Sequence, residues 1–116
     1  MSDLYVSGMA IAPSVVETIV TMAARDVEGV ASIGADAPGG LRALLPGGKQ
    51  TNQGVAVEVD DDDKLHISVR IDVKSGHMLP DVAADVRRAI ADAIAMQVGV
   101  EVGSVDVFID GIHFSK

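Results

Sequence analysis

The fold is decided by the stretch Leu65-His66-Ile67-Ser68-Val69-Arg70-Ile71-Asp72-Val73-Lys74. Aliphatic and polar side chains alternate along its whole length, and a period of two is typical of a β-strand with one buried and one solvated face. A sheet of this kind needs helices on its apolar face only, since its polar face can meet water. The stretch therefore predicts a sheet that is covered on one side.

The neighbouring sequence predicts the other strands of this sheet. Residues 55–59 also alternate, and only the acidic segment 60–64 separates them from residue 65, so we expect an antiparallel hairpin. Residues 105–109 alternate in the same way near the end of the chain. Beyond Gly111 the apolar positions shift by one residue, and this shift predicts a bulge at that point.

Two segments have the spacing of amphipathic helices, namely Ser14–Asp26 and about Pro80–Val98, each followed closely by a glycine. We expect one short strand over Leu4–Ile11 and a short extended piece over Val30–Ile33. The order is β-α-(β)-β-β-α-β. It predicts an α+β fold, with a three- to four-stranded antiparallel or mixed sheet and two helices on one face.

Residues 34–53 lack regular periodicity and are rich in glycine, so we expect a flexible loop within a single domain of residues 1–116. Gly47-Gly48-Lys49 resembles part of a phosphate-binding loop. The match fails because Ala43 stands where the first glycine is required and Gln50 where a serine or threonine is required. The apolar residues Leu41, Leu44 and Leu45 within the loop are candidates for a contact with a partner.

The composition excludes several classes of protein. The chain has 116 residues with 9 Lys and Arg against 17 Asp and Glu, a formal net charge of −8, and no cysteine. Its acidity argues against nucleic-acid binding, which needs a basic surface. It has no apolar run of the ~18–20 residues that a membrane span requires, so we expect a cytoplasmic protein without direct membrane insertion.

No pattern of residues predicts a catalytic, cofactor-binding or metal-binding site. The acidic run Asp60–Asp63 lacks the glycine and glutamate of a calcium loop, and we interpret it as a solvated turn. The three histidines have no ligand spacing and no cysteine to complete a zinc set. No G-x-S-x-G motif surrounds a nucleophile, so we expect a non-enzymatic protein.

The polar face of the expected sheet is acidic. Residues 1–53 contain three basic and five acidic residues, whereas residues 54–116 contain six basic and twelve acidic ones. The face is either ordinarily solvated or a docking surface for a basic partner or a neighbouring copy. The candidate residues of such a surface are Glu58, Asp60, His66, Arg70, Asp72, Asp106 and Asp110, together with the three loop leucines.

Six segments in order resemble the alkaline shock protein family of Gram-positive bacteria, also called the envelope stress response or general stress family. They are Gly8–Val16, Glu28-Gly29-Val30, Gly54-Val55-Ala56-Val57, Gly76, Gly99-Val100 and Val105–Ile112. The resemblance spans nearly the whole chain. It implies a cytoplasmic, non-enzymatic protein linked to cell-envelope homeostasis and to alkaline or general stress, with no catalytic residues to transfer.

The resemblance also implies a scaffold or interaction module. Such a module would self-associate as a homo-oligomer or dock on a protein partner, for example a membrane-anchored relative. Two alternatives remain at this point. One is a small ligand- or lipid-linked accessory protein. The other is a K-homology-like nucleic-acid module, which would need a G-x-x-G between adjacent helices that this sequence does not place there.

Overall fold

A computed structural model describes residues 3–34 and 54–114 of the chain. The described residues form strands β1 (Leu4–Val6), β2 (Met9–Ile11), β3 (Val30–Ile33), β4 (Val55–Val59), β5 (Leu65–Lys74) and β6 (Val102–His113), and helices α1 (Pro13–Arg25) and α3 (Leu79–Gln97). The loop expected at 34–53, with its three leucines, lies outside the described residues apart from Gly34. The predicted α+β class is confirmed, and the element order differs from the prediction only before α1, where the structure has two strands.

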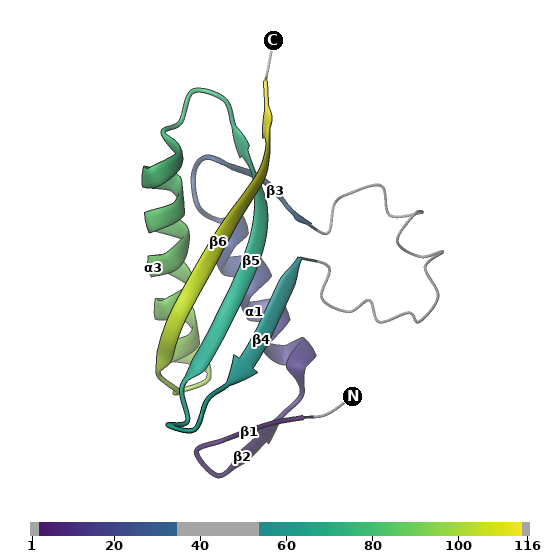
Figure 1. The fold of residues 1–116 in the computed structure, drawn as a ribbon, viewed down its shortest axis with the longest axis vertical. Coiled ribbons are helices and arrows are strands. Elements are labelled where there is room, and N and C mark those ends of the chain that lie inside the picture. Colours follow the sequence, from purple (N-terminus) through teal and green to yellow (C-terminus); the bar gives the residue numbers. More distant parts are fainter. Residues whose placement is uncertain (1–2, 35–53, 115–116) are drawn as a thin grey trace, which may run out of the picture.

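Strand β5 is the centre of a mixed sheet (Figure 1). β6 runs parallel to it along one edge, and β3 and β4 run antiparallel to it. Ile33 of β3 pairs with Ile71, and Val55 of β4 pairs with Val69. β3 and β4 therefore lie end to end along the other edge of β5, as two halves of one broken strand.

The break between the two halves is held by two glycines in close contact. A Cβ atom placed on Gly54 would lie 3.0 Å from the Cα of Gly34, and Gly54 has a φ of +98°. The backbone N–H of Arg70 donates to the carbonyl of Gly54 at 2.9 Å. Only glycine combines this backbone conformation with so close an approach.

Both helices cover the same face of the sheet, as the alternation in β5 predicts. In Figure 1, α1 lies behind the strands and α3 lies alongside β6. The inward side chains of β5 are all buried and pack against both helices. Among the described residues the core contains no buried polar side chain; its helix members are Val16, Val20, Ala24, Val82, Val86, Ile90 and Ile94.

Two expectations about the strands need correction or refinement. The single strand predicted over Leu4–Ile11 is wrong, because Ser7 and Gly8 adopt φ values of 52° and 78° and fold the segment into the hairpin β1–β2. Positive φ at both positions is what a two-residue hairpin turn requires. The bulge predicted near Gly111 is confirmed, since Ile109 pairs with Ile71 and Gly111 with Asp72. Asp110 is thus the extra residue.

The position of the core predicts that substitutions at two sites on α3 have very different effects on the free energy of unfolding. Ile90 is fully buried and Met96 is 84% exposed. Ile90→Ala should lower the free energy of unfolding by about 2–5 kcal/mol, because a cavity replaces packed methyl groups. Met96→Ala should change it by less than about 0.5 kcal/mol. Urea denaturation measures both values, and losses of similar size in the two variants would contradict this core.

Candidate functional site

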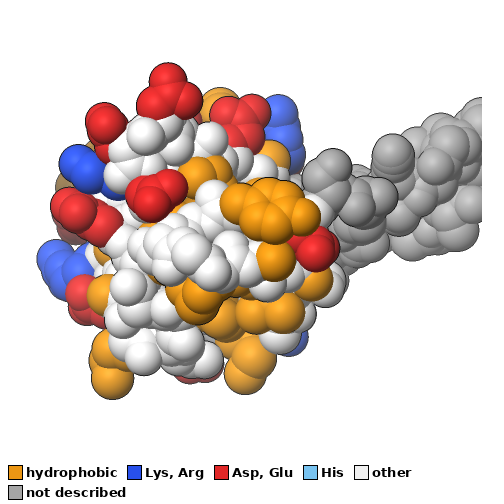
Figure 2. All heavy atoms as spheres, turned by 90° about the horizontal axis from the view of Figure 1, so that it is seen from below, with side chains coloured by type: hydrophobic (Ala, Val, Ile, Leu, Met, Phe, Trp, Pro, Cys, Tyr) orange, Lys and Arg blue, Asp and Glu red, His pale blue; other side chains and the backbone are white. Residues whose placement is uncertain are grey.

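The polar side of the sheet is uncovered by the helices, and we call it the open sheet face. The structure places all seven candidate side chains from the sheet and its turn on this face: Glu58, Asp60, His66, Arg70, Asp72, Asp106 and Asp110. Seen from the end that carries the β4–β5 turn, acidic side chains gather toward one side of the molecule and hydrophobic ones toward the other (Figure 2). The face is therefore mainly polar and acidic, with Phe108 as an exposed aromatic side chain on it.

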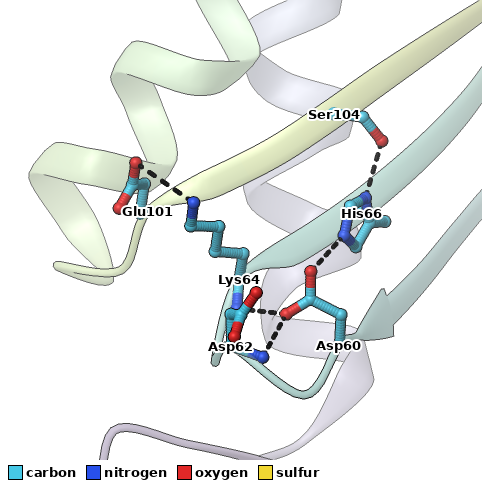
Figure 3. A network of polar contacts seen from close by, with 6 residues as sticks. All are labelled: Asp60, Asp62, Lys64, His66, Glu101 and Ser104. Atoms are coloured by element: carbon cyan, nitrogen blue, oxygen red, sulfur yellow. Dashed lines mark hydrogen bonds and ion pairs between the residues drawn. The ribbon is translucent and has the colours of Figure 1, made fainter.

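One end of the open sheet face holds a chain of three polar side chains centred on His66 (Figure 3). Its Nε2 lies 2.6 Å from Oδ2 of Asp60, and its Nδ1 lies 2.7 Å from Oγ of Ser104 on β6. Asp60 also accepts hydrogen bonds from the backbone N–H groups of Asp62 and Lys64, at 2.8 and 3.0 Å. The carboxylate thus joins the turn to the sheet.

These hydrogen bonds stabilise the ionised form of Asp60. The bond to His66 is the largest cause, the backbone N–H of Lys64 is the next, and together they lower the pKa of Asp60 to about 2. A carboxyl with a lowered pKa in the folded state stabilises the fold above its unfolded value of 3.8. This contribution is lost as the pH falls through the folded value.

Gly103 makes room for the imidazole of His66. A Cβ atom at this position would lie 2.7 Å from Cε1 and 3.0 Å from Nε2 of the ring. The glycine sits next to Ser104, which bonds the same ring. The sequence did not reveal this contact, because it depends on the parallel register that brings Ser104 opposite His66.

The middle of the face is built around Arg70. Its guanidinium donates to Oδ1 of Asp110 at 2.9 Å and lies 4.9 Å from the ring centre of Phe108. A cavity of about 480 Å³ opens beside this group. Its remaining lining is small, namely Gly34, Gly54, Val55, Ala56 and Ser68. The centre of the face is therefore a shallow trough with an aromatic and an acidic group at its side.

The opposite end of the face repeats the pairing of histidine with aspartate. Nε2 of His113 lies 2.9 Å from Oδ2 of Asp72, and the hydroxyl of Ser32 donates to the same oxygen at 3.3 Å. Sequence reasoning missed His113 as a member of this face. The signal was the shift of parity at the bulge, which turns residue 113 to the same side as Lys74.

The residues Asp60, His66 and Ser104 form a contiguous acid–histidine–serine chain, which raises the question of a hydrolase. In the Ser–His–Asp template the serine bonds Nε2 and the acid bonds Nδ1, the reverse of the arrangement found here. None of the three lines the cavity on this face. The geometry therefore fits an electrostatic cluster better than an acyl-transfer site.

A second cavity, of about 590 Å³, lies between β2, α1 and the end of α3. Its lining is mainly apolar, with Met9, Ile11, Val15, Ile19 and Val98 beside Ser14, Thr18 and Gln97. An apolar ligand of the accessory-protein alternative would fit here rather than on the open sheet face. The two surfaces are built from different elements and can be tested separately.

Neither a metal-binding cluster nor a membrane-spanning helix is found among the described residues. Within residues 3–34 and 54–114, no three His, Cys, Asp or Glu side chains gather as a metal site. In the same ranges, no helix combines the length and the apolar character that crossing a bilayer would require.

The comparisons with known proteins agree with the resemblance seen in the sequence. Residues 5–114 match the model of the alkaline shock protein 23 family, described as having a cell envelope-related function. The uncharacterized protein YqhY of Bacillus subtilis (strain 168) is 33% identical over 113 residues, which covers 97% of this chain and 82% of that protein. The family match thus includes every strand of the open sheet face.

The contact between Gly103 and His66 predicts a coupled pair of substitutions. Gly103→Ala should displace the imidazole from Asp60 and Ser104 and lower the free energy of unfolding by about 1–2 kcal/mol. In a His66→Ala background the same change should be neutral or slightly stabilising, since alanine is better than glycine in a strand. Urea denaturation of the four proteins gives the coupling, and additive effects would contradict the contact.

The cause assigned to the low pKa of Asp60 predicts the effect of His66→Gln. The pKa of Asp60 should rise from about 2 toward its ordinary value of 3.8, because the largest stabilising contact of the carboxylate is removed. Carbon NMR of the side-chain carboxyl measures this titration. His77→Gln, at a histidine outside the open sheet face, is the control and should leave it unchanged; an equal shift in both variants would show that His66 is not the cause.

Proposed function

The chain belongs to the alkaline shock protein 23 family, whose function is cell envelope-related, and we propose that it is a non-enzymatic interaction module that docks a protein partner through its open sheet face. The proposed partner presents a lysine- or arginine-rich segment, for example on a membrane-anchored relative. The protein would act at the cytoplasmic side of the envelope in the response to alkaline or general stress. The acidic sheet face, which none of the described helices covers, is the observation that supports this function best.

The charges of the open sheet face support a basic partner. Its five carboxylates are Glu58, Asp60, Asp72, Asp106 and Asp110, whereas its permanent cations are Arg70 and Lys74. At the turn, the charge of Lys64 is balanced by Glu101, with which it pairs at 4.0 Å. The side chains of Glu58 and Asp106 are exposed and lie on either side of β5, on β4 and β6. Such a surface attracts a basic segment, speeds its association and discriminates against acidic partners.

The same charges disfavour two other partners. Phosphate groups of nucleic acids and of anionic lipids have the sign of this face, so both would be repelled. The two described helices are also separated in the chain by β3, β4 and β5, whereas the K-homology module needs a glycine-containing turn between adjacent helices. A basic protein segment fits the face better than either.

Self-association belongs to the proposal as a second property of the module. Two open sheet faces would repel each other, because each is acidic. A homo-oligomer would therefore use a different surface and leave the open sheet face free. Sedimentation at several protein concentrations measures the oligomeric state, and a chain that stays monomeric at high concentration would exclude this part of the proposal.

Docking on the open sheet face predicts which charges control binding. The probe is a synthetic peptide of about 12 residues with alternating arginine and serine, long enough to follow β5 at ~3.3 Å per residue. Glu58→Gln with Asp106→Asn should weaken its binding roughly 2- to 30-fold in calorimetry, because each exposed charge pair contributes about 0.2–1 kcal/mol. The loss should shrink as salt is added.

The matched control changes the same two residue types elsewhere. Glu28 and Asp92 are exposed and lie off the open sheet face, before β3 and on α3. Glu28→Gln with Asp92→Asn alters the net charge equally and should weaken binding much less. Equal losses in the two double variants would show that the peptide responds only to net charge, and absence of binding would refute the proposed function.

A further inference from the structure

We propose that a basic partner docks on the open sheet face with release of protons from His66 and His113, so that docking strengthens as the pH rises. This inference rests on the proposed function and concerns the regulation of the same face. Its basis is that both histidines are paired with carboxylates and that the partner would engage these same carboxylates. The imidazole is the side chain whose ordinary titration falls between about pH 5 and pH 8.

The surroundings of His66 accept either protonation state without rearrangement. In the neutral ring, Nε2–H donates to Asp60 and Nδ1 accepts from the hydroxyl of Ser104. In the imidazolium, Nδ1–H donates to Oγ of Ser104 after the hydroxyl rotates, and the bond to Asp60 remains. A proton can therefore leave His66 while every heavy atom stays in place.

The other charged groups around His66 are of both signs. Glu58 on β4 is its cross-strand neighbour, and Lys64 precedes it by two residues on the turn. Lys64 is itself directed toward Glu101, with 4.0 Å between Nζ and Oε2. On the side of β6, the nearest polar group is the uncharged Ser104. The carboxylate of Asp60 is thus the group in direct contact with the ring.

His113 has a similar but more open setting. Its side chain is 56% exposed, and its Nε2 contacts Asp72. Lys74 on β5 is its neighbour in the register, and Ser32 on β3 bonds the same carboxylate oxygen. The ring of His113 thus has one anionic neighbour, Asp72, and one cationic neighbour, Lys74.

Protonation of the two histidines changes the charge of the face substantially. The five carboxylates exceed the cations Arg70 and Lys74 by three, and the charges of the pair Lys64–Glu101 cancel. With both imidazoles protonated, the excess falls to one. A cationic partner and the two protons therefore compete for the same carboxylates, and linkage requires that partner binding releases protons where the imidazoles are partly charged.

The test is titration calorimetry of the arginine–serine peptide at several values between about pH 5.5 and pH 8. Repeating it in two buffers of different ionisation enthalpy counts the protons that binding releases. We expect proton release within this range and an affinity roughly three- to tenfold higher at the alkaline end, since an exposed charge alters affinity by a few-fold. The arginines of the peptide stay charged throughout.

Substitutions assign the protons to their source. His66→Gln with His113→Gln should abolish proton release and flatten the dependence of affinity on pH. The control is His77→Gln, because His77 lies between β5 and α3 beside Gly29. This variant should behave like the unsubstituted protein. If the double variant fails to fold by circular dichroism, His113→Gln alone should remove part of the release.

The possible results separate the two claims. Binding without proton release, or release that persists in the folded double variant, overturns this inference and leaves the proposed function standing. No binding of the peptide at any pH, with binding instead to vesicles of anionic lipid, overturns both. Weaker binding at alkaline pH also overturns the inference, because it would show that protonation of the face favours the basic partner instead of opposing it.

Discussion

The structure depends on the burial of one side of β5. Its inward residues Leu65, Ile67, Val69, Ile71 and Val73 are almost completely inaccessible and supply the centre of the core. A shift of the register by one residue would move all five to the solvent and bring His66, Arg70 and Asp72 into the core, so the pairing has no nearby alternative. The two helices, the parallel strand β6 and the broken strand β3–β4 are all arranged around this side.

The open sheet face follows from the same alternation. Because the helices cover one side, the other side must remain hydrated or meet a partner. Its side chains are paired across strands, by His66 with Asp60, Arg70 with Asp110 and His113 with Asp72. Exposed ion pairs usually contribute little to stability, so these pairs are compatible with the role in recognition that we propose for this face.

Much of the fold could be predicted because its signals are local. The period of two in β5, the helical spacings and the shift of parity at Gly111 are each visible in residues that are close together in the chain. The β1–β2 hairpin was missed because Ser7 at positive φ is unusual for a residue other than glycine. The acidic residues of the open sheet face were placed correctly, since they share the parity of β5 or of its neighbours.

The finer structure of the face could not be predicted, because it depends on which strands are neighbours. The contact of His66 with Ser104 and the space left by Gly103 arise from the parallel pairing of β5 with β6. Likewise, His113 meets Asp72 only because Asp110 is the extra residue of the bulge. Residues separated by about 40 positions in the chain are brought together by register, which a single sequence does not specify.

The central claim is that this face is where a basic partner docks. Its most direct test is to follow backbone amide resonances of the isotopically labelled protein by NMR while the arginine–serine peptide is added. The account predicts that the resonances which shift map to β4, β5, β6 and the β4–β5 turn. Shifts confined to α1, α3 or the apolar cavity beside β2 would contradict it.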